Sequence, residues 1–322
     1  MTTARLNPEL LIYHIKPERV RIVRDRVRAR FPDLTVHTAS TPAEAEAVID
    51  RVEIVAGWAF PSPLLAKAGR LRWFHKLAAG VDDVVLSGAL PAGVMLTRTD
   101  GRVFAGRMAE YVIAYILAFC QGIRRSLAQQ QARRWRPFLT RTAAGSTVGV
   151  AGVGDIGREV ARKAAALGMR VVGWRRSPGA VEGVERMYSG RDQFHEFLGE
   201  ADFVVIVLPL TPATRGLFDA AAFNAMRPGA YLINVGRGAV VDEQALLDAL
   251  RSGRLAGAAL DVFAQEPLPA DHPLWEMENV YVTPHISGLA LPEEVCEPFL
   301  DNLDRYLRGE PLEKQVVLEL GY

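Results

Sequence analysis

The sequence predicts an α/β protein whose parallel sheets are covered by helices on both faces. Short apolar runs alternate with helical stretches along most of the chain, and a glycine-rich turn joins one such run directly to a helix. The composition is that of an ordinary globular protein, with 49% hydrophobic and 23% charged residues. At roughly 100–200 residues per domain, the length of 322 residues predicts two domains.

Five apolar runs in the first hundred residues have the length and bounds of strands. A helical stretch with apolar residues at i, i+3 and i+7, Glu18–Phe31, separates the first run from the second. The predicted strands are Leu10–Ile15, Leu34–Ala39, Glu53–Ala59, Leu71–Leu77 and Val94–Thr99.

One long helix is predicted next, over Val103–Gln131. Its first half is apolar on nearly every side, so we expect it to be buried all round, within its domain or against a second subunit. The segment Trp135-Arg136-Pro137 would end it, because proline cannot continue a helix.

A second βα series begins at Ser146. Its helices include Asp242–Ser252, with Asp242 as N-cap and Gly253 as the stop, and a last helix, Pro292–Arg308. The predicted strands are Thr147–Ala151, Met169–Trp174, Phe203–Leu208, Tyr231–Val235, Ala258–Val262 and Val280–Thr283.

Charge and apolar patterning exclude several classes of protein. The 38 basic and 37 acidic residues leave a net charge of +1, which provides no bulk field for nucleic acid or an anionic membrane. The longest apolar run, Tyr111–Cys120, is shorter than the about 20 residues of a membrane span. Two cysteines, Cys120 and Cys296, form neither a disulfide framework nor a metal cage. Since the chain also begins without an apolar signal core, we expect a soluble cytoplasmic protein without a metal.

The clearest local signal is the segment Gly152-Val153-Gly154-Asp155-Ile156-Gly157, which lies between a predicted strand and a predicted helix, Arg158–Leu167. Glycines in this setting permit a tight turn, a close backbone approach to pyrophosphate and close helix–strand packing. The helix N-terminus supplies N–H groups and a positive dipole end for the phosphates. The segment predicts a dinucleotide site; the alternative is a glycine turn that binds no ligand.

The next strand indicates which dinucleotide is bound. An NAD site usually has an acidic residue about 20 residues on, which accepts from the ribose 2′-OH. Here Met169–Trp174 ends in Arg175, Arg176 and Ser177, and two guanidiniums with a hydroxyl suit a 2′-phosphate. Arginine outnumbers lysine 33 to 5, so the missing acid is the stronger half of the argument. NADP is the predicted cofactor, with NAD as the alternative.

Three further polar residues follow strands of the second series. Arg237 comes after Asn234-Val235-Gly236, Glu266 stands before Pro267, and His285 follows Pro284. Because ligands bind at the carboxyl ends of parallel strands, we expect all three near the bound nicotinamide. Taken alone, each is more readily explained as a solvated loop residue.

Four motifs in this order resemble the D-isomer-specific 2-hydroxyacid dehydrogenases, and the resemblance covers nearly the whole chain. It implies that Arg237 binds the substrate, that His285 is the acid–base histidine and that Glu266 is its carboxylate partner. Asp261 would hold the carboxamide and ribose region of the nicotinamide. The motifs are Val150–Gly157, Ala230–Asp242, Ala259–Pro267 and Thr283–Gly288.

The resemblance also implies two Rossmann-like, doubly wound parallel-sheet domains with a cleft between them. Residues 1–100 and 290–322 would form the substrate domain, and residues 101–289 the dinucleotide-binding domain. Members are typically homodimers, with the counterpart of the long 103–131 helix in the interface.

Further contacts complete the expected site. The backbone of Ala78, Ala79 and Gly80 resembles the carboxylate-binding loop of the family. Trp58, Phe60 and His75 stand where they could contact the rest of the substrate. Besides the glycine segment, the expected cofactor contacts are Trp174, Arg175, Arg176, Ser177, Leu208, Pro209, Thr214, Val235, Gly236, Arg237, Asp261, His285, Ser287 and Gly288.

These expectations describe an oxidoreductase that transfers a hydride between NADP(H) and a 2-keto acid/D-2-hydroxy acid pair. Arg237 would hold the carboxylate and polarise the carbonyl, and His285, charged beside Glu266, would protonate the developing alkoxide. The strand end Trp174–Ser177 resembles the NADPH-using glyoxylate/hydroxypyruvate reductases, so the substrate would be glyoxylate, hydroxypyruvate or a larger 2-keto acid. The alternatives are a phosphite or other unusual-substrate dehydrogenase on the same scaffold, or a dinucleotide-responsive, corepressor-like binding protein.

Overall fold

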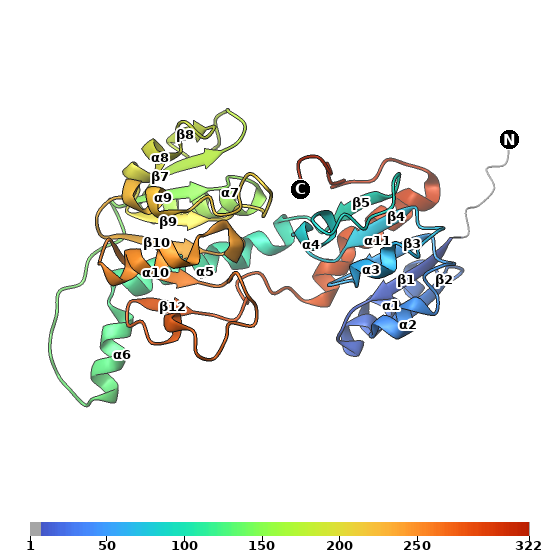
Figure 1. Cartoon of the computed structure of the whole chain (residues 1–322), viewed down its shortest axis with the longest axis horizontal. Helices are drawn as coiled ribbons and strands as arrows, with labels where there is room; N and C mark the ends of the chain where they lie inside the picture. The colour runs from blue at the N-terminus through green and yellow to red at the C-terminus, as the bar shows by residue number, and fades with distance from the viewer. Residues whose placement is uncertain (1–7, 322) are drawn as a thin grey trace. The chain divides into compact units, whose positions relative to one another are not determined.

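The computed structural model describes residues 8–321, which divide into two compact units (Figure 1). Unit 1 contains residues 8–103 and 290–321, and unit 2 is Phe104–Leu289. Each unit is built around one parallel sheet, with five strands in unit 1 and seven in unit 2. The predicted α/β class with two parallel-sheet domains is confirmed.

The sheet of unit 1 has the strand order β2-β1-β3-β4-β5. All five predicted strands are present, and α11 (Pro292–Arg308) returns from the C-terminal region to pack against α1 (Pro17–Arg30). Ion pairs such as Arg30 Nη1 to Asp301 Oδ1, at 2.9 Å, join these two helices. The strands are β1 (Glu9–Tyr13), β2 (Thr35–Ala39), β3 (Ile54–Gly57), β4 (Trp73–Lys76) and β5 (Met95–Arg98), and the short helices are α2 (Pro42–Glu46), α3 (Ser62–Leu65) and α4 (Asp82–Val85).

The sheet of unit 2 has the order β12-β11-β10-β9-β6-β7-β8, and every pairing is parallel. The chain adds β7 and β8 on one side of β6 and then returns to add β9 on the other, so the order reverses between β6 and β9. Ligands of doubly wound sheets bind at the carboxyl ends of the strands beside such a reversal. The strands are β6 (Thr147–Ala151), β7 (Arg170–Arg175), β8 (Arg186–Ser189), β9 (Phe203–Ile206), β10 (Ala230–Asn234), β11 (Leu255–Leu260) and β12 (Val280–Val282).

Strand β8 was not predicted from the sequence. Its four residues, Arg-Met-Tyr-Ser, lack an apolar run, because β8 lies at the sheet edge and pairs only with β7. An edge strand needs little apolar sequence, since one of its sides faces no other strand.

The predicted single helix over 103–131 is wrong. Gly122 adopts a left-handed conformation with φ of 60° and separates α5 (Arg102–Cys120) from α6 (Ile123–Gln131). The expectation of burial on all sides is also wrong within the chain, because α5 buries one stripe that includes Phe104, Val112 and Ile116. α6 has no buried residue. By length and hydropathy alone α5 could cross a membrane, although core helices of soluble proteins pass the same test.

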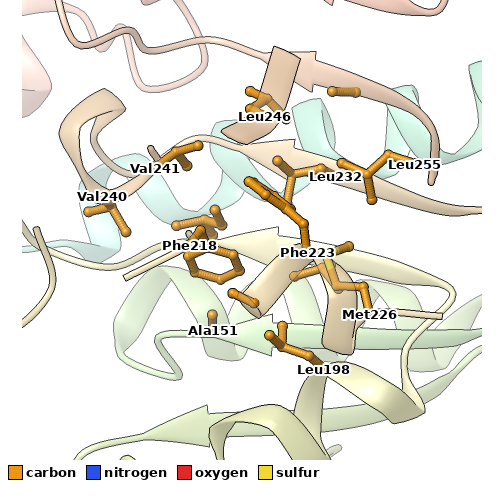
Figure 2. Packing of buried hydrophobic residues seen from close by; sticks show 14 of the residues in the cluster. Ala151, Leu198, Phe218, Phe223, Met226, Leu232, Val240, Val241, Leu246 and Leu255 are labelled. Atoms are coloured by element: carbon orange, nitrogen blue, oxygen red, sulfur yellow. The ribbon is translucent and has the colours of Figure 1, made fainter. Parts of the chain in front are cut away.

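The core of unit 2 holds the strand ends in place. Aromatic and aliphatic side chains from β10, α9 (Ala220–Ala225) and α10 (Glu243–Arg251) interlock on one face of the sheet (Figure 2). Phe218 and Leu232 in this cluster are fully buried, and Phe223 is almost so. Close packing of this kind transmits any local shift, so the chain turns that leave β9, β10 and β11 have a rigid base. Two more helices, α7 (Asp155–Ala166) and α8 (Phe194–Glu200), complete the cover of the sheet.

Candidate functional site

The glycine segment, residues 152–157, forms a tight turn between β6 and α7, and one side of this glycine cradle is open. Gly152 has φ of +103°, and a Cβ there would lie 2.7 Å from the carbonyl oxygen of Val207. A Cβ on Gly157 would lie 2.1 Å from the carbonyl oxygen of Gly152, so only glycine permits this turn to close. By contrast, a Cβ on Gly154 would meet nothing within 4 Å. Gly154 is also the N-cap of α7 and provides no capping side chain. The open side and the helix N-terminus therefore fit a pyrophosphate.

The end of β7 is organised by Arg175. Its guanidinium donates to the carbonyl oxygens of Ser177 at 2.9 Å, Pro178 at 3.3 Å and Gly179 at 3.1 Å. The guanidinium expected to grip a phosphate thus shapes the loop, while Arg176 and Ser177 are exposed beside it. Trp174, also expected at the cofactor, buries its ring against Phe194 in the core, and its Nε1 donates to the carbonyl oxygen of Gly190.

His285 and Glu266 are joined by a hydrogen bond. The Nδ1 atom of His285 lies 2.7 Å from Oε2 of Glu266, and the two side chains are 50% and 36% exposed. The second oxygen of Glu266 accepts from the backbone N–H of Phe263 at 3.0 Å. Glu266 therefore accepts at both oxygens, and the ring of His285 is oriented with Nε2 pointing away from the carboxylate.

The surroundings of Glu266 keep its carboxyl ionised. Partial burial by itself raises the pKa, but the hydrogen bonds from His285 and Phe263, together with the charges of His285 and Arg237, outweigh burial and lower the pKa of Glu266. The carboxylate form is the one that accepts the Nδ1 proton of His285.

Arg237 is presented by a turn directly after β10. The Asn234 side chain shapes this turn, because its Oδ1 accepts from the N–H of Gly236 at 3.0 Å and its Nδ2 donates to the carbonyl of Arg237 at 3.2 Å. Nη1 of Arg237 donates to the carbonyl oxygen of Gly236 at 2.9 Å. Gly238 lets this turn touch the loop after β11, since a Cβ there would lie 1.9 Å from the carbonyl carbon of Phe263. This contact joins the turn that carries Arg237 to the loop that carries Glu266.

Asp261 ties the histidine loop to the end of β11. Its carboxylate is fully buried. Oδ1 accepts from the Thr283 hydroxyl at 2.6 Å and from the N–H of Ile286 at 2.9 Å, and Oδ2 accepts from the N–H of Ser287 at 2.8 Å. The N–H of His285 donates to the Asp261 carbonyl at 2.9 Å. The resemblance points this residue at the nicotinamide; in the structure both carboxylate oxygens are engaged by the histidine loop.

The remaining expected cofactor residues lie at the same ends of the strands of unit 2. Leu208 and Val235 are buried, and Thr214 Oγ1 donates to the carbonyl of Pro209 at 2.7 Å, which closes the turn after β9. Gly288 lies against Met108, where a Cβ would be 3.3 Å from the sulfur. The structure thus brings the expected residues of unit 2 to one sheet edge, with the indole of Trp174 turned into the core.

In unit 1 the expected substrate residues separate into surface and core. Ala78, Ala79 and Gly80 follow β4 and are partly exposed. Trp58 is 36% exposed after β3. Phe60 and His75 are buried, and burial lowers the pKa of His75 to about 3. Neither side chain is therefore on a surface of unit 1.

Sequence reasoning overlooked His14. It follows β1, and its ring stacks on Trp58 with centroids 4.9 Å apart and an interplanar angle of 10°. Its Nδ1 accepts from the N–H of Lys16 at 3.0 Å. Burial, with a smaller effect of the nearby cations, lowers the pKa of His14 to about 4. The sequence feature that could have drawn attention to His14 is its position directly after a strand of a parallel sheet, where ligands bind.

Comparison with known proteins gives consistent matches. The family model described as D-isomer specific 2-hydroxyacid dehydrogenase, NAD binding domain, matches residues 113–287. Glyoxylate/hydroxypyruvate reductase A of Serratia proteamaculans is 38% identical over 270 residues, which are 82% of this chain and 86% of that protein.

Solved structures agree over almost the whole chain. A D-isomer specific 2-hydroxyacid dehydrogenase from Xanthobacter autotrophicus, in complex with NADPH and MES, is 37% identical with a TM-score of 0.91, covering 98% of this chain and 100% of that one. The NADPH-dependent glyoxylate/hydroxypyruvate reductase of Sinorhizobium meliloti, in complex with NADP and sulfate, is 35% identical with a TM-score of 0.90 and the same coverage.

The close approach at Gly238 leaves no room for a side chain at this position. Gly238→Ala should lower the free energy of unfolding by roughly 1–3 kcal/mol or more, because the new methyl group overlaps backbone atoms that cannot rotate away. Gly154→Ala is the matched control, since its methyl would enter open space. Denaturant unfolding of both variants checks this. If Gly238→Ala unfolds like Gly154→Ala, the two turns do not need their contact.

Proposed function

Because the chain belongs to the D-isomer specific 2-hydroxyacid dehydrogenase family, we propose that it is an NADP(H)-dependent reductase of 2-keto acids. The observation that carries the proposal is the 2.7 Å contact of His285 with Glu266, at the same edge of the unit 2 sheet as Arg237 and the glycine cradle. The named relatives support glyoxylate and hydroxypyruvate as first substrates.

The cofactor would be held by unit 2. The N–H groups at the start of α7 and the open side of Gly154 suit the pyrophosphate. Arg176 and Ser177 suit a 2′-phosphate, on a loop whose shape depends on Arg175. When bound, the nicotinamide supplies the hydride. The absence of an acidic residue at this strand end and the NADP(H)-bound neighbours support NADP over NAD.

The proton is assigned to His285. With Nδ1 held by Glu266, Nε2 is the nitrogen available to a substrate oxygen. In the reducing direction Nε2 gives its proton to the forming alkoxide. Arg237 is a planar donor suited to a carboxylate and to the carbonyl oxygen beside it.

We assign the other substrate contacts to unit 1. The backbone N–H groups of Ala78, Ala79 and Gly80 would bind the carboxylate, and Trp58 would contact the group attached to the keto carbon. Phe60 and His75 would act only by supporting these surfaces from the core.

We also propose that the protein is a cytoplasmic homodimer formed through unit 2. A groove of about 460 Å³ between α5 and α7 has an apolar part formed by Ile113, Leu117 and Leu167, together with Ala114 and Ala166, and is bordered by the charged residues Glu110, Arg162 and Lys163. From the same unit, α6 and the extended segment after it carry Trp135 and Leu139, which are 95% and 99% exposed. In Figure 1 this segment loops away from the sheet of unit 2. Exposed apolar residues of this kind favour contact with a partner, and we propose that the partner is a second copy of the chain.

His285→Ala should retain NADPH binding and lose about 10²-fold or more of turnover, because only the proton donor is removed. Stopped-flow reduction of glyoxylate and hydroxypyruvate, with fluorescence titration of NADPH, measures both. Turnover of His285→Ala near the wild-type rate would refute the role assigned to His285.

Arg237→Ala should raise KM for the keto acid as well as lower kcat, measured in the same way.

Arg176→Ala should raise KM for NADPH by roughly tenfold and leave KM for NADH nearly unchanged, since a charged hydrogen bond to a 2′-phosphate would be lost. Steady-state kinetics with both cofactors tests this. Equal effects on the two cofactors would place the phosphate contact elsewhere.

Leu117→Asp should convert the dimer into monomers by placing a charge in the apolar groove. Light scattering after size exclusion gives the mass. Leu86→Asp, at a leucine of unit 1 that is 45% exposed, is the control and should remain dimeric. A dimeric Leu117→Asp protein would exclude the groove as the interface.

A further inference from the structure

A tyrosine of α5 is connected to the histidine loop by hydroxyl groups. The hydroxyl of Tyr111 lies 2.7 Å from Oγ1 of Thr283, and Thr283 donates to Asp261 Oδ1 at 2.6 Å. A threonine hydroxyl has a single proton, which here goes to the carboxylate. Tyr111 must therefore be the donor to Thr283, and the chain of donors runs from Tyr111 through Thr283 to Asp261.

The hydrogen bonds from Tyr111 through Thr283 end at Asp261, which holds the strained loop of His285. His285 has φ of +53°, a left-handed conformation that is unfavourable for a residue with a Cβ. The loop is kept in this shape by the N–H groups of Ile286 and Ser287, which donate to the two oxygens of Asp261. Asp261 can hold both amides only while its own position is fixed, and Thr283 is the side chain that fixes it.

We propose that Tyr111 is a positioning residue for His285, acting through Thr283 and Asp261, an inference that rests on the proposed acid–base role of His285. The hydroxyl of Tyr111 orients the Thr283 hydroxyl toward Asp261, and Asp261 in turn keeps the His285 loop in its strained conformation. Nε2 of His285 is thereby held at a constant place relative to Glu266. No contact with substrate or cofactor is assigned to Tyr111.

The neighbouring aromatic residues distinguish this role from simple packing. Tyr111 belongs to a group of contacting rings, in which Tyr115 is tilted against Tyr111 and meets Tyr281 edge to face. The hydroxyls of Tyr281 and of nearby Tyr231 are buried and have no hydrogen-bond partner within the geometric limits in the described structure. Burial raises the pKa of Tyr111 well above its usual range, which keeps it a donor throughout the working pH range.

Tyr111→Phe tests the proposal, with Tyr281→Phe as the matched control, since each removes one buried phenol oxygen from the same cluster. Hydrogen–deuterium exchange of a peptide covering residues 283–289 should be faster in Tyr111→Phe by about five- to tenfold. Its kcat should fall by a similar factor, while the melting temperature, KM and the affinity for NADPH stay close to the wild-type values. Tyr281→Phe should match the wild type in every measurement.

Hydrogen exchange reports on the positioning role of Tyr111, and turnover by the wild-type protein reports on the proposed function. If wild-type protein reduces no 2-keto acid, the proposed function fails, yet the exchange comparison still decides whether Tyr111 orders the loop. If Tyr111→Phe exchanges and turns over like Tyr281→Phe, the positioning role is overturned. Should Tyr111→Phe fail to fold, Thr283→Val and Thr283→Ser replace it. The valine variant should reproduce the loss, and the serine variant, which keeps the hydroxyl, should recover most of it.

Discussion

The close contact between the turn after β10 and the loop after β11 is the constraint on which the rest of the candidate site depends. It exists because Gly238 has no side chain to separate the turn from Phe263. The charge of Arg237 helps to lower the pKa of Glu266, and Glu266 in turn orients the ring of His285. A parallel sheet brings the carboxyl ends of β10, β11 and β12 to one side, and the glycine at position 238 allows the turn after β10 to contact the loop after β11.

The polar groups of the candidate site are of two kinds: partly exposed groups that could reach a ligand, and buried groups that hold the loops in place. Asp261 is fully buried, and both of its carboxylate oxygens accept hydrogen bonds from the histidine loop. His285 and Glu266 are partly exposed, and Nε2 of His285 remains available. Buried groups of this kind are costly unless fully hydrogen-bonded, and Asp261 is. His285, the proposed acid–base residue, has a positive φ, and the hydrogen bonds from its loop to Asp261 hold it in that conformation.

Helix α5 serves three parts of the molecule at once. Its buried stripe anchors it to the core of unit 2, Tyr111 reaches the histidine loop, and Leu117 faces the groove proposed as a subunit interface. A helix has enough faces for this, because residues four apart share one face and intervening residues lie on others. The proposed dimer contact and the placement of His285 therefore share one rigid element.

The sequence by itself determined the α/β class, most strand positions, the glycine cradle and the family, because periodicity and short motifs are local properties. It also singled out Arg237, Glu266 and His285, since residues after parallel strands must gather at one edge. Only the tertiary structure decided which partners each side chain contacts or hydrogen-bonds. Arg175 turned to its own loop carbonyls, His75 entered the core and His14 stacked on Trp58. The break at Gly122, the edge strand β8 and the link from Tyr111 to Asp261 likewise depend on partners distant in the sequence or on the conformation of one residue, which no local pattern records.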